Sequence, residues 1–281
     1  MPTPAEKIAK VIHRSMVRQA GEVAGVTDKV AVSLSGGVDS CGVLAAFLEV
    51  GLRPTCYSYT PSTHESTDFK MARQTAENMD LEFHGVIVQM EPRNLESQAR
   101  YVMKHGARTK VQVESLVPIA NVVALAGKLG LDVFATGDQS DGYFSLSRSA
   151  NFVRYDETSE RIDNNRRDYY KKDKSCSGLI DDLCKLRGMD GLFPFRHPTI
   201  YKAFLGNTWQ EVNKPRLKEP VKLAFGDWFQ PDKILTRTHQ VNLHKGDSRF
   251  GDTFAEILMD HIPGDWRSPA GLYGAMRRGE A

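Results

Sequence analysis

A short apolar segment at residues 29–34 (KVAVSL) runs directly into the polar, glycine-rich sequence SGGVDS at residues 35–40. Apolar side chains then recur at helical spacing as far as Gly51, where the pattern ends. The order of apolar run, glycine turn and helix predicts a buried strand, a tight loop and a helix that packs back on the strand.

The same unit repeats along the first half of the chain. Further strands are predicted at residues 54–60, 82–89 and 131–136, and helices at residues 68–78 and 115–129. Strands that alternate with helices indicate an α/β fold with a mostly parallel, doubly wound sheet covered on both faces. In such sheets ligands bind at the carboxyl ends of the strands, and the loop at residues 35–40 falls at one of these ends.

The loop at residues 35–40 has the composition of a phosphate-binding turn. Gly36 and Gly37 allow the backbone to approach a polyphosphate closely, and the amides of the loop and of the next helical turn can converge on an anion. Ser35 and Ser40 add hydroxyl donors, whereas Asp39 would repel phosphate and is better suited to hold Mg²⁺. We expect Asp39 to lie on an exposed loop. The alternative is a strand-to-helix turn without a ligand, which the complete motif disfavours.

The chain divides into four segments by composition. We expect an N-terminal amphipathic helix in residues 1–28, a nucleotide-binding α/β core in residues 29–148, a charged loop in residues 149–176 and a helical C-terminal region in residues 177–281. The N-terminal helix begins after Thr3 and lacks the continuous apolar run of a signal peptide. The charged loop is dense in Arg, Lys and Asp, which favours a solvated loop over a lid that grips substrate.

Overall composition narrows the protein class. The chain has 281 residues, 41% hydrophobic and 26% charged, with a formal net charge of +2. That charge gives no indication of a nucleic-acid or membrane partner, although it leaves nucleic acid open. Four cysteines form no CxxC pair, namely Cys41, Cys56, Cys176 and Cys184. Neither a zinc site nor a disulfide framework is therefore indicated, and we expect a cytoplasmic protein.

The SGGxDS motif at residues 35–40 resembles that of the PP-loop ATP pyrophosphatases. Three later segments, residues 115–144, 186–195 and 218–237, resemble in the same order the synthetase domain of asparagine synthetase and β-lactam synthetase. The resemblance implies that the chain binds ATP and Mg²⁺, splits ATP between its α- and β-phosphates and adenylates a carboxylate. An amine or ammonia would then displace AMP to form an amide.

The resemblance also implies site residues. Pyrophosphate would be held by the loop residues Ser35, Gly36, Gly37, Val38, Asp39 and Ser40. Asp39 and Asp141 would bind Mg²⁺. Thr136 and Gly137 would lie against the adenosine, with backbone near Ser33 and Ser58, and Asp138 would act as a base or orienting group. A turn that uses Asp138 and Asp141 only for local hydrogen bonds is the alternative.

Several residues depart from the family pattern. Gln139 replaces a glycine, and the acidic residue and glycine pair expected after Asp141 are missing. His239 stands where the family has a lysine that stabilises departing pyrophosphate, and Lys245 follows six residues later. We expect one of these two residues to supply the positive charge.

The acceptor side of the reaction leaves alternatives open. Residue 2 is Pro rather than the cysteine nucleophile of a glutaminase domain, so nitrogen would come from free ammonia, a substrate amine or a separate ammonia-supplying glutaminase. A small-molecule carboxylate is the expected substrate, and oligomerisation is open. Two other interpretations are a PP-loop sulfurtransferase that acts on tRNA or a nucleotide, and a non-catalytic nucleotide-binding homologue.

Overall fold

The computed structural model describes residues 1–144, 162–164, 166–168, 176–237 and 250–281, and its core is a five-stranded sheet. The strands are β1 (Val30–Ser33), β2 (Thr55–Pro61), β3 (Phe83–Val88), β4 (Val133–Ala135) and β5 (Asp190–Leu192). Their order is β3-β2-β1-β4-β5, and every neighbouring pair is parallel. The expected α/β fold with a parallel sheet is confirmed.

The centre of the sheet sets the position of a ligand site. Val32 of β1 aligns with Cys56 of β2 on one side and with Ala135 of β4 on the other. The chain builds outward from β1 to β3, then returns to add β4 on the opposite side of β1. This is the reversal of strand order at which open α/β sheets bind ligands, and the loops after β1 and β4 meet there.

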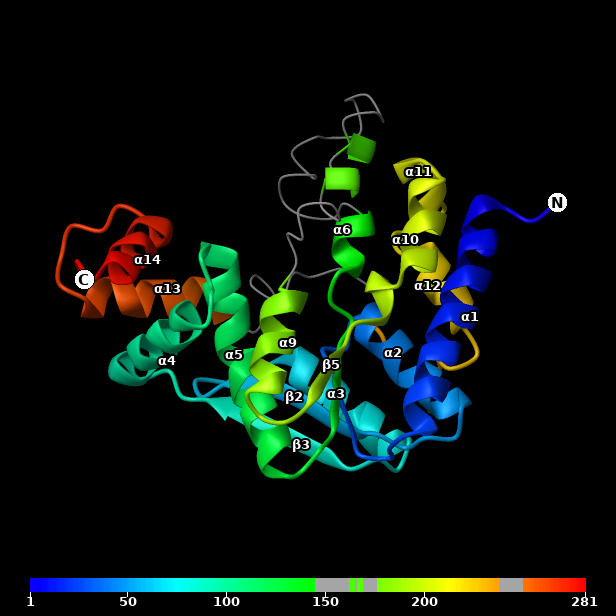
Figure 1. Ribbon diagram of the computed structural model, residues 1–281, viewed down its shortest axis with the longest axis horizontal. Coiled ribbons are helices and arrows are strands. Elements are labelled where there is room, and N and C mark those ends of the chain that lie inside the picture. Colours follow the sequence, from blue (N-terminus) through cyan, green and yellow to red (C-terminus); the bar gives the residue numbers. More distant parts are fainter. Residues whose placement is uncertain (145–161, 165, 169–175, 238–249) are drawn as a thin grey trace.

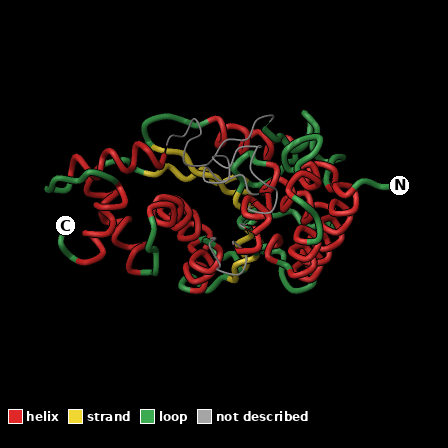
Figure 2. Tube along the Cα trace, turned by 90° about the horizontal axis from the view of Figure 1, so that it is seen from above, coloured by secondary structure: helices red, strands yellow, loops and turns green. Residues whose placement is uncertain are grey.

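Helices cover both faces of the sheet (Figures 1 and 2). One face packs against α1 (Pro4–Ala24), α2 (Val38–Glu49), α3 (Thr67–Asn78), α6 (Ser140–Phe144), α10 (Pro198–Leu205), α11 (Trp209–Val212) and α12 (Glu219–Ala224), with the short 3₁₀ helix η1 (Pro194–Arg196). The other packs against α4 (Pro92–Lys104), α5 (Lys110–Lys128), α9 (Ser177–Lys185), α13 (Phe250–His261) and α14 (Pro269–Arg278). Two apolar cores therefore lie on either side of the strands.

The N-terminal helix is part of the first core. Thr3 caps α1 in a capping box with Glu6, as its sequence predicts, and the helix packs against α2 and α12. Gly42 of α2 lets α12 approach closely, because a Cβ there would lie 3.3 Å from both Val221 and Phe225 side chains. The start of α12 is thereby held beside the start of α2.

The charged segment is partly anchored rather than solvated. Residues 162–164 and 166–168 are helical, and Arg166 is only 1% exposed. Its guanidinium forms an ion pair with Asp163 at 2.7 Å and donates hydrogen bonds to the carbonyls of Tyr143 and Phe204 at 2.6 and 2.7 Å. The expectation of a solvated loop is wrong for Arg166, because this arginine satisfies carbonyls at the ends of α6 and α10.

None of the helices described is long and apolar enough to cross a membrane.

Candidate nucleotide-binding site

The SGGVDS sequence forms the turn between β1 and α2. Gly36 has φ +64°, a conformation that favours glycine, and Gly37 is the N-cap of α2. The Ser40 hydroxyl closes the loop, since it accepts a hydrogen bond from the Ser35 amide at 3.2 Å and donates to the Gly37 carbonyl at 3.1 Å. Because a glycine N-cap has no side chain to occupy the first amides of α2, these donors are suited to an anion.

Arg237 binds two backbone carbonyls of this turn. Its amide donates to the Gly36 carbonyl at 3.1 Å, and its guanidinium donates to the Ser35 carbonyl at 2.9 Å. The guanidinium also forms an ion pair with the buried carboxylate of Asp68 on α3. Two carbonyls of the glycine turn are thus satisfied by one arginine, which holds the loop in position.

Asp39 and Asp141 converge on a single cation, the ammonium of Lys218. Asp39 lies in the first turn of α2, and its Oδ2 accepts a hydrogen bond from the Lys218 Nζ. Asp141 lies in the first turn of α6, and its Oδ1 is 2.5 Å from the same nitrogen. The two predicted metal ligands, which are 102 positions apart in sequence, therefore meet where the loops after β1 and β4 come together.

Lys218 reaches this position through an unusual backbone. It is the N-cap of α12 and has φ +58°, a left-handed conformation that disfavours residues with a Cβ. Its amide donates to Asn213 Oδ1 at 3.3 Å, and the Asn213 side-chain amide in turn donates to the Phe144 carbonyl at 3.2 Å. A residue held in a strained conformation by such contacts is a candidate for function.

The ionisation of the cluster follows from its burial and its charges. Burial raises the pKa of Asp39 and Asp141 raises it further, while the Lys218 ammonium acts in the opposite direction. Burial lowers the pKa of Lys218, but the carboxylates of Asp141 and Asp39 outweigh this and the pKa is raised above its usual value. At neutral pH the lysine therefore carries the positive charge between the two aspartates.

The residues fit a divalent cation. Asp39 Oδ1 is buried and has no hydrogen-bond partner among the described residues, while the Asp141 side chain is 57% exposed. Two convergent carboxylates, one of them open to solvent, suit Mg²⁺, which takes its other ligands from water and phosphate oxygens. No cluster of three or more His, Cys, Asp or Glu side chains suited to a metal occurs in the described residues. The expectation that Asp39 lies on an exposed loop is wrong, because the residue is only 9% exposed.

Two of the predicted adenosine residues, Ser33 and Thr136, lie at the carboxyl ends of central strands, whereas Ser58 lies within a strand. Ser33 ends β1, Thr136 follows β4 directly, and Ser58 lies in β2 beside Gly85 of β3. Alternation along the strands places Ser33 and Thr136 on one face of the sheet and Ser58 on the other. Their contact with adenosine stays a prediction.

The turn after β4 presses against the glycine loop. A Cβ on Gly137 would lie 2.7 Å from the Ser40 amide nitrogen, so only glycine fits. The Asp138 amide donates to the Thr136 hydroxyl at 3.0 Å, and the role of Asp138 as a base stays a prediction. Gln139 has φ +84° and a buried side chain whose Oε1 has no partner among the described residues. The residue that replaces a family glycine thus keeps a glycine-like backbone.

Two of the predicted catalytic residues are not placed, and one residue was missed. His239 and Lys245 lie outside the described residues. Lys218 was not predicted as a site residue, although it begins the segment at residues 218–237 that resembles the family. The available signal was the position of Lys218 as the first residue of that segment.

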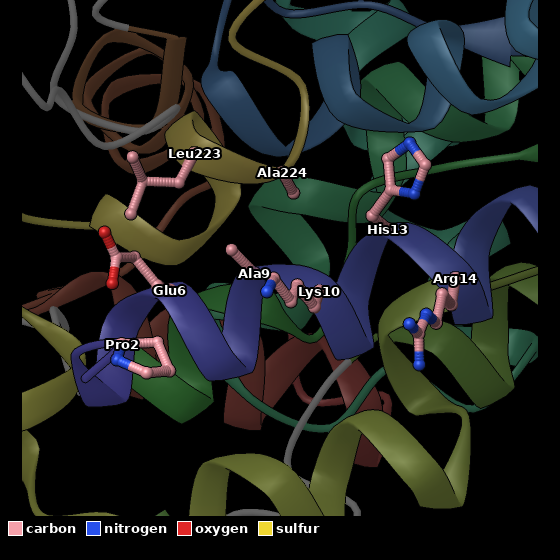
Figure 3. A pocket seen from close by; sticks show the side chains of 8 residues that line it. All are labelled: Pro2, Glu6, Ala9, Lys10, His13, Arg14, Leu223 and Ala224. Atoms are coloured by element: carbon pink, nitrogen blue, oxygen red, sulfur yellow. The ribbon is translucent and has the colours of Figure 1, made fainter.

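A separate cavity lies on the outer side of α1. It has a volume of about 430 Å³ and is lined by Glu6, Lys10, His13 and Arg14, with Leu223 of α12 across from them (Figure 3). It includes none of the predicted site residues. We place the nucleotide site at the two strand ends rather than in this cavity, because the glycine turn and the convergent carboxylates are there.

Together the parallel sheet, the SGGVDS turn and the paired aspartates define the PP-loop class of ATP-binding proteins. A sequence model of the asparagine synthase family matches residues 17–168, which is more than half of the chain and includes both aspartates. The chain belongs to the asparagine synthase family, a family of ATP-dependent synthetases.

Comparisons with individual proteins add little to this. No curated protein sequence matches the chain significantly. Among solved structures, the NMN synthetase from Francisella tularensis is similar over 83% of this chain and 99% of its own length, with 12% sequence identity and a TM-score of 0.38.

Proposed function

We propose that the protein is an AMP-forming synthetase that adenylates a carboxylate and lets an amine or ammonia displace AMP. The observation that carries the proposal is the convergence of Asp39 and Asp141 on one cation beside the SGGVDS turn. That arrangement brings together phosphate-binding amides, two carboxylates for Mg²⁺ and an ammonium. Together these elements can stabilise the negative charge that develops as pyrophosphate leaves.

Each group of the site has a role in this reaction. The amides of the glycine turn and the Ser35 and Ser40 hydroxyls bind the β- and γ-phosphates and fix the direction in which pyrophosphate leaves. Asp39 and Asp141 would hold Mg²⁺, which neutralises phosphate charge when bound. Lys218 is the described cation best placed to stabilise the departing pyrophosphate, a role that the sequence assigned to His239 or Lys245.

The chemistry consists of two displacements. A carboxylate oxygen of the acceptor attacks the α-phosphorus, the bond to the bridging oxygen breaks, and pyrophosphate leaves with the electron pair. The nitrogen of ammonia or an amine then attacks the acyl carbon, and AMP leaves with one original carboxylate oxygen. Asp138 would accept the proton that the nitrogen loses.

The cysteines disfavour the sulfurtransferase alternative. All four are buried. Burial raises the pKa of the Cys41, Cys56 and Cys184 thiols to about 12, whereas a sulfur carrier needs an accessible thiolate.

Transfer of ¹⁸O tests the proposed function directly. The protein is incubated with ATP, Mg²⁺, an ammonium salt and a panel of amino-acid and nucleotide carboxylates labelled with ¹⁸O. We expect one ¹⁸O atom to appear in the phosphate of AMP, in an amount equal to the amide formed. Amide formation with unlabelled AMP, or ¹⁸O in inorganic phosphate, would refute adenylation of the carboxylate.

A further inference from the structure

The Lys218 ammonium lies between the two carboxylates that are predicted to hold Mg²⁺. Its Nζ is hydrogen-bonded to Asp39 Oδ2 and lies 2.5 Å from Asp141 Oδ1, so both predicted metal ligands already hold a cation. Two cations cannot share these oxygens, because charges a few ångströms apart repel strongly in a partly buried site. A metal ion held by both carboxylates would therefore compete with the ammonium.

From this geometry we infer that Lys218 is an internal counterion that guards the metal site until the nucleotide arrives. The inference rests on the proposed function. Metal entry displaces the ammonium from Asp39 and Asp141, and the displaced ammonium moves to the phosphate oxygens of ATP. In the absence of nucleotide the ammonium has no second anion to move to, so metal alone binds only weakly and displaces the ammonium only at high concentration.

The side chain and its surroundings suit this exchange. A lysine has a flexible four-carbon stem that can move its charge while its backbone stays fixed. The backbone is fixed, since Asn213 binds the Lys218 amide and α12 packs on α2 at Gly42. Phe144 lies beside the ammonium, with its ring centroid 6.0 Å from Nζ. The two carboxylates are therefore the main groups that hold the ammonium in place.

The charges of the two carboxylates explain why a counterion is needed at this site. Without a cation, the carboxylates at the starts of α2 and α6 would face each other, one of them buried, and such an arrangement is unfavourable. Lys218 stabilises the protein without nucleotide and prevents tight binding of metal alone. ATP and metal then enter together, and the lysine is delivered to the phosphates in the same step.

Manganese binding without nucleotide tests the inference. Free Mn²⁺ is measured by electron paramagnetic resonance during titration of the wild type, Lys218→Met and Lys222→Met. Lys222 is on the same helix and has no hydrogen bond or ion pair to either aspartate, so its variant controls for loss of a positive charge. We expect Lys218→Met to bind Mn²⁺ at least about tenfold more tightly than the wild type, and Lys222→Met to differ from it by less than about threefold. Equal Mn²⁺ affinity in Lys218→Met and the wild type would overturn the inference.

A second measurement uses the wild type alone, in case Lys218→Met does not fold. Reductive methylation of lysines is followed by mass spectrometry with and without saturating Mn²⁺, in the absence of nucleotide. We expect Lys218 to be methylated at least about threefold faster when Mn²⁺ is bound, with the rate at Lys222 unchanged, because only Lys218 is released from an ion pair. No change at Lys218 under saturating Mn²⁺ would contradict the exchange.

The outcome is separable from that of the proposed function. Mn²⁺ affinity and methylation report on Lys218 whether or not the protein forms an adenylate. A wild type that forms labelled AMP but shows no effect of Lys218 on Mn²⁺ would overturn the counterion role and leave the synthetase reaction intact.

Discussion

Gly137 lies so close to Asp39 that a Cβ at position 137 would be 2.8 Å from the Asp39 carbonyl carbon and 2.7 Å from the Ser40 amide nitrogen. The turn after β4 and the loop after β1 are therefore in direct backbone contact. The two loops carry the predicted metal ligands, and they can lie this close because residue 137 has no side chain.

Gly137→Ala should separate these two loops. Because the clash is with backbone atoms, relief requires the SGGVDS turn to shift. We expect the Kd for a non-hydrolysable ATP analogue to rise at least about tenfold, measured by isothermal titration calorimetry. Gly25→Ala is the control, because Gly25 has φ −72° and its added Cβ would be 3.5 Å from the nearest atom. Unchanged analogue affinity in Gly137→Ala would contradict the role of this contact.

Asp39→Asn should remove a predicted metal ligand and one of the two carboxylates that form ion pairs with Lys218. Loss of a ligand that stabilises the transition state should slow Mg²⁺-dependent pyrophosphate release about a thousandfold. Because the residue is buried, we also expect the free energy of unfolding to fall by about 1–3 kcal/mol, measured by urea denaturation. The exposed Asp232→Asn should match the wild type in both measurements. Pyrophosphate release near the wild-type rate in Asp39→Asn would disprove the metal assignment.

Arg237 and Asp68 should behave as a coupled pair. Arg237→Gln leaves the Asp68 carboxylate buried without its cation, which should lower the free energy of unfolding by about 3 kcal/mol. Adding Asp68→Asn removes the uncompensated charge, so the double variant should be more stable than Arg237→Gln alone. Urea denaturation of the two single variants and the double variant measures the coupling. Additive losses would show that the pair does not interact.

Much of the fold followed from local sequence patterns. The strands β1 to β4 and the helices α1 to α3 are marked by apolar runs, caps and glycine stops, all of which depend on neighbouring residues. The three-residue strand β5 was not predicted, because it is a strand only through pairing with β4. The helix α4 was also missed, although its local pattern was available, because apolar residues recur at helical spacing after Pro92, at Leu95, Ala99, Val102 and Met103.

The site was predictable where its residues belong to continuous motifs. Asp39 and Asp141 come from such motifs, and their convergence follows from the positions of β1 and β4. The burial of Asp39 and its contact with Lys218 depend on α12, which comes 179 positions later, so no local pattern could reveal them. The burial of Arg166 was not predicted for a similar reason. A segment rich in charged residues indicates a solvated loop, and the carbonyls that Arg166 binds belong to other helices.

The stability of the protein should fall at alkaline pH because of its buried thiols. The pKa values of Cys41, Cys56 and Cys184 are raised to about 12 in the folded protein, against about 8.5 in an unfolded chain. Their contribution to stability is therefore fully present below about pH 8.5 and is lost as the pH rises from there toward 12. Each thiol should add up to about 1.4 kcal/mol per pH unit to the slope of the free energy of unfolding.

Urea denaturation between pH 7 and pH 10 measures this slope, with dithiothreitol present to keep the thiols reduced. Cys56→Ala should show a smaller decline than the wild type, because one ionising thiol is removed. A decline that is identical in the two proteins would contradict the raised pKa of Cys56.

The products of ATP cleavage test the central claim most directly. The protein is incubated with ATP, Mg²⁺ and the carboxylate and amine panel, and the nucleotide and phosphate products are separated by chromatography and identified by ³¹P NMR. Cleavage at the α-phosphate predicts AMP and pyrophosphate in equal amounts, with both products lost in Asp39→Asn. ADP and inorganic phosphate as the main products would contradict the assignment of the SGGVDS turn to a departing pyrophosphate.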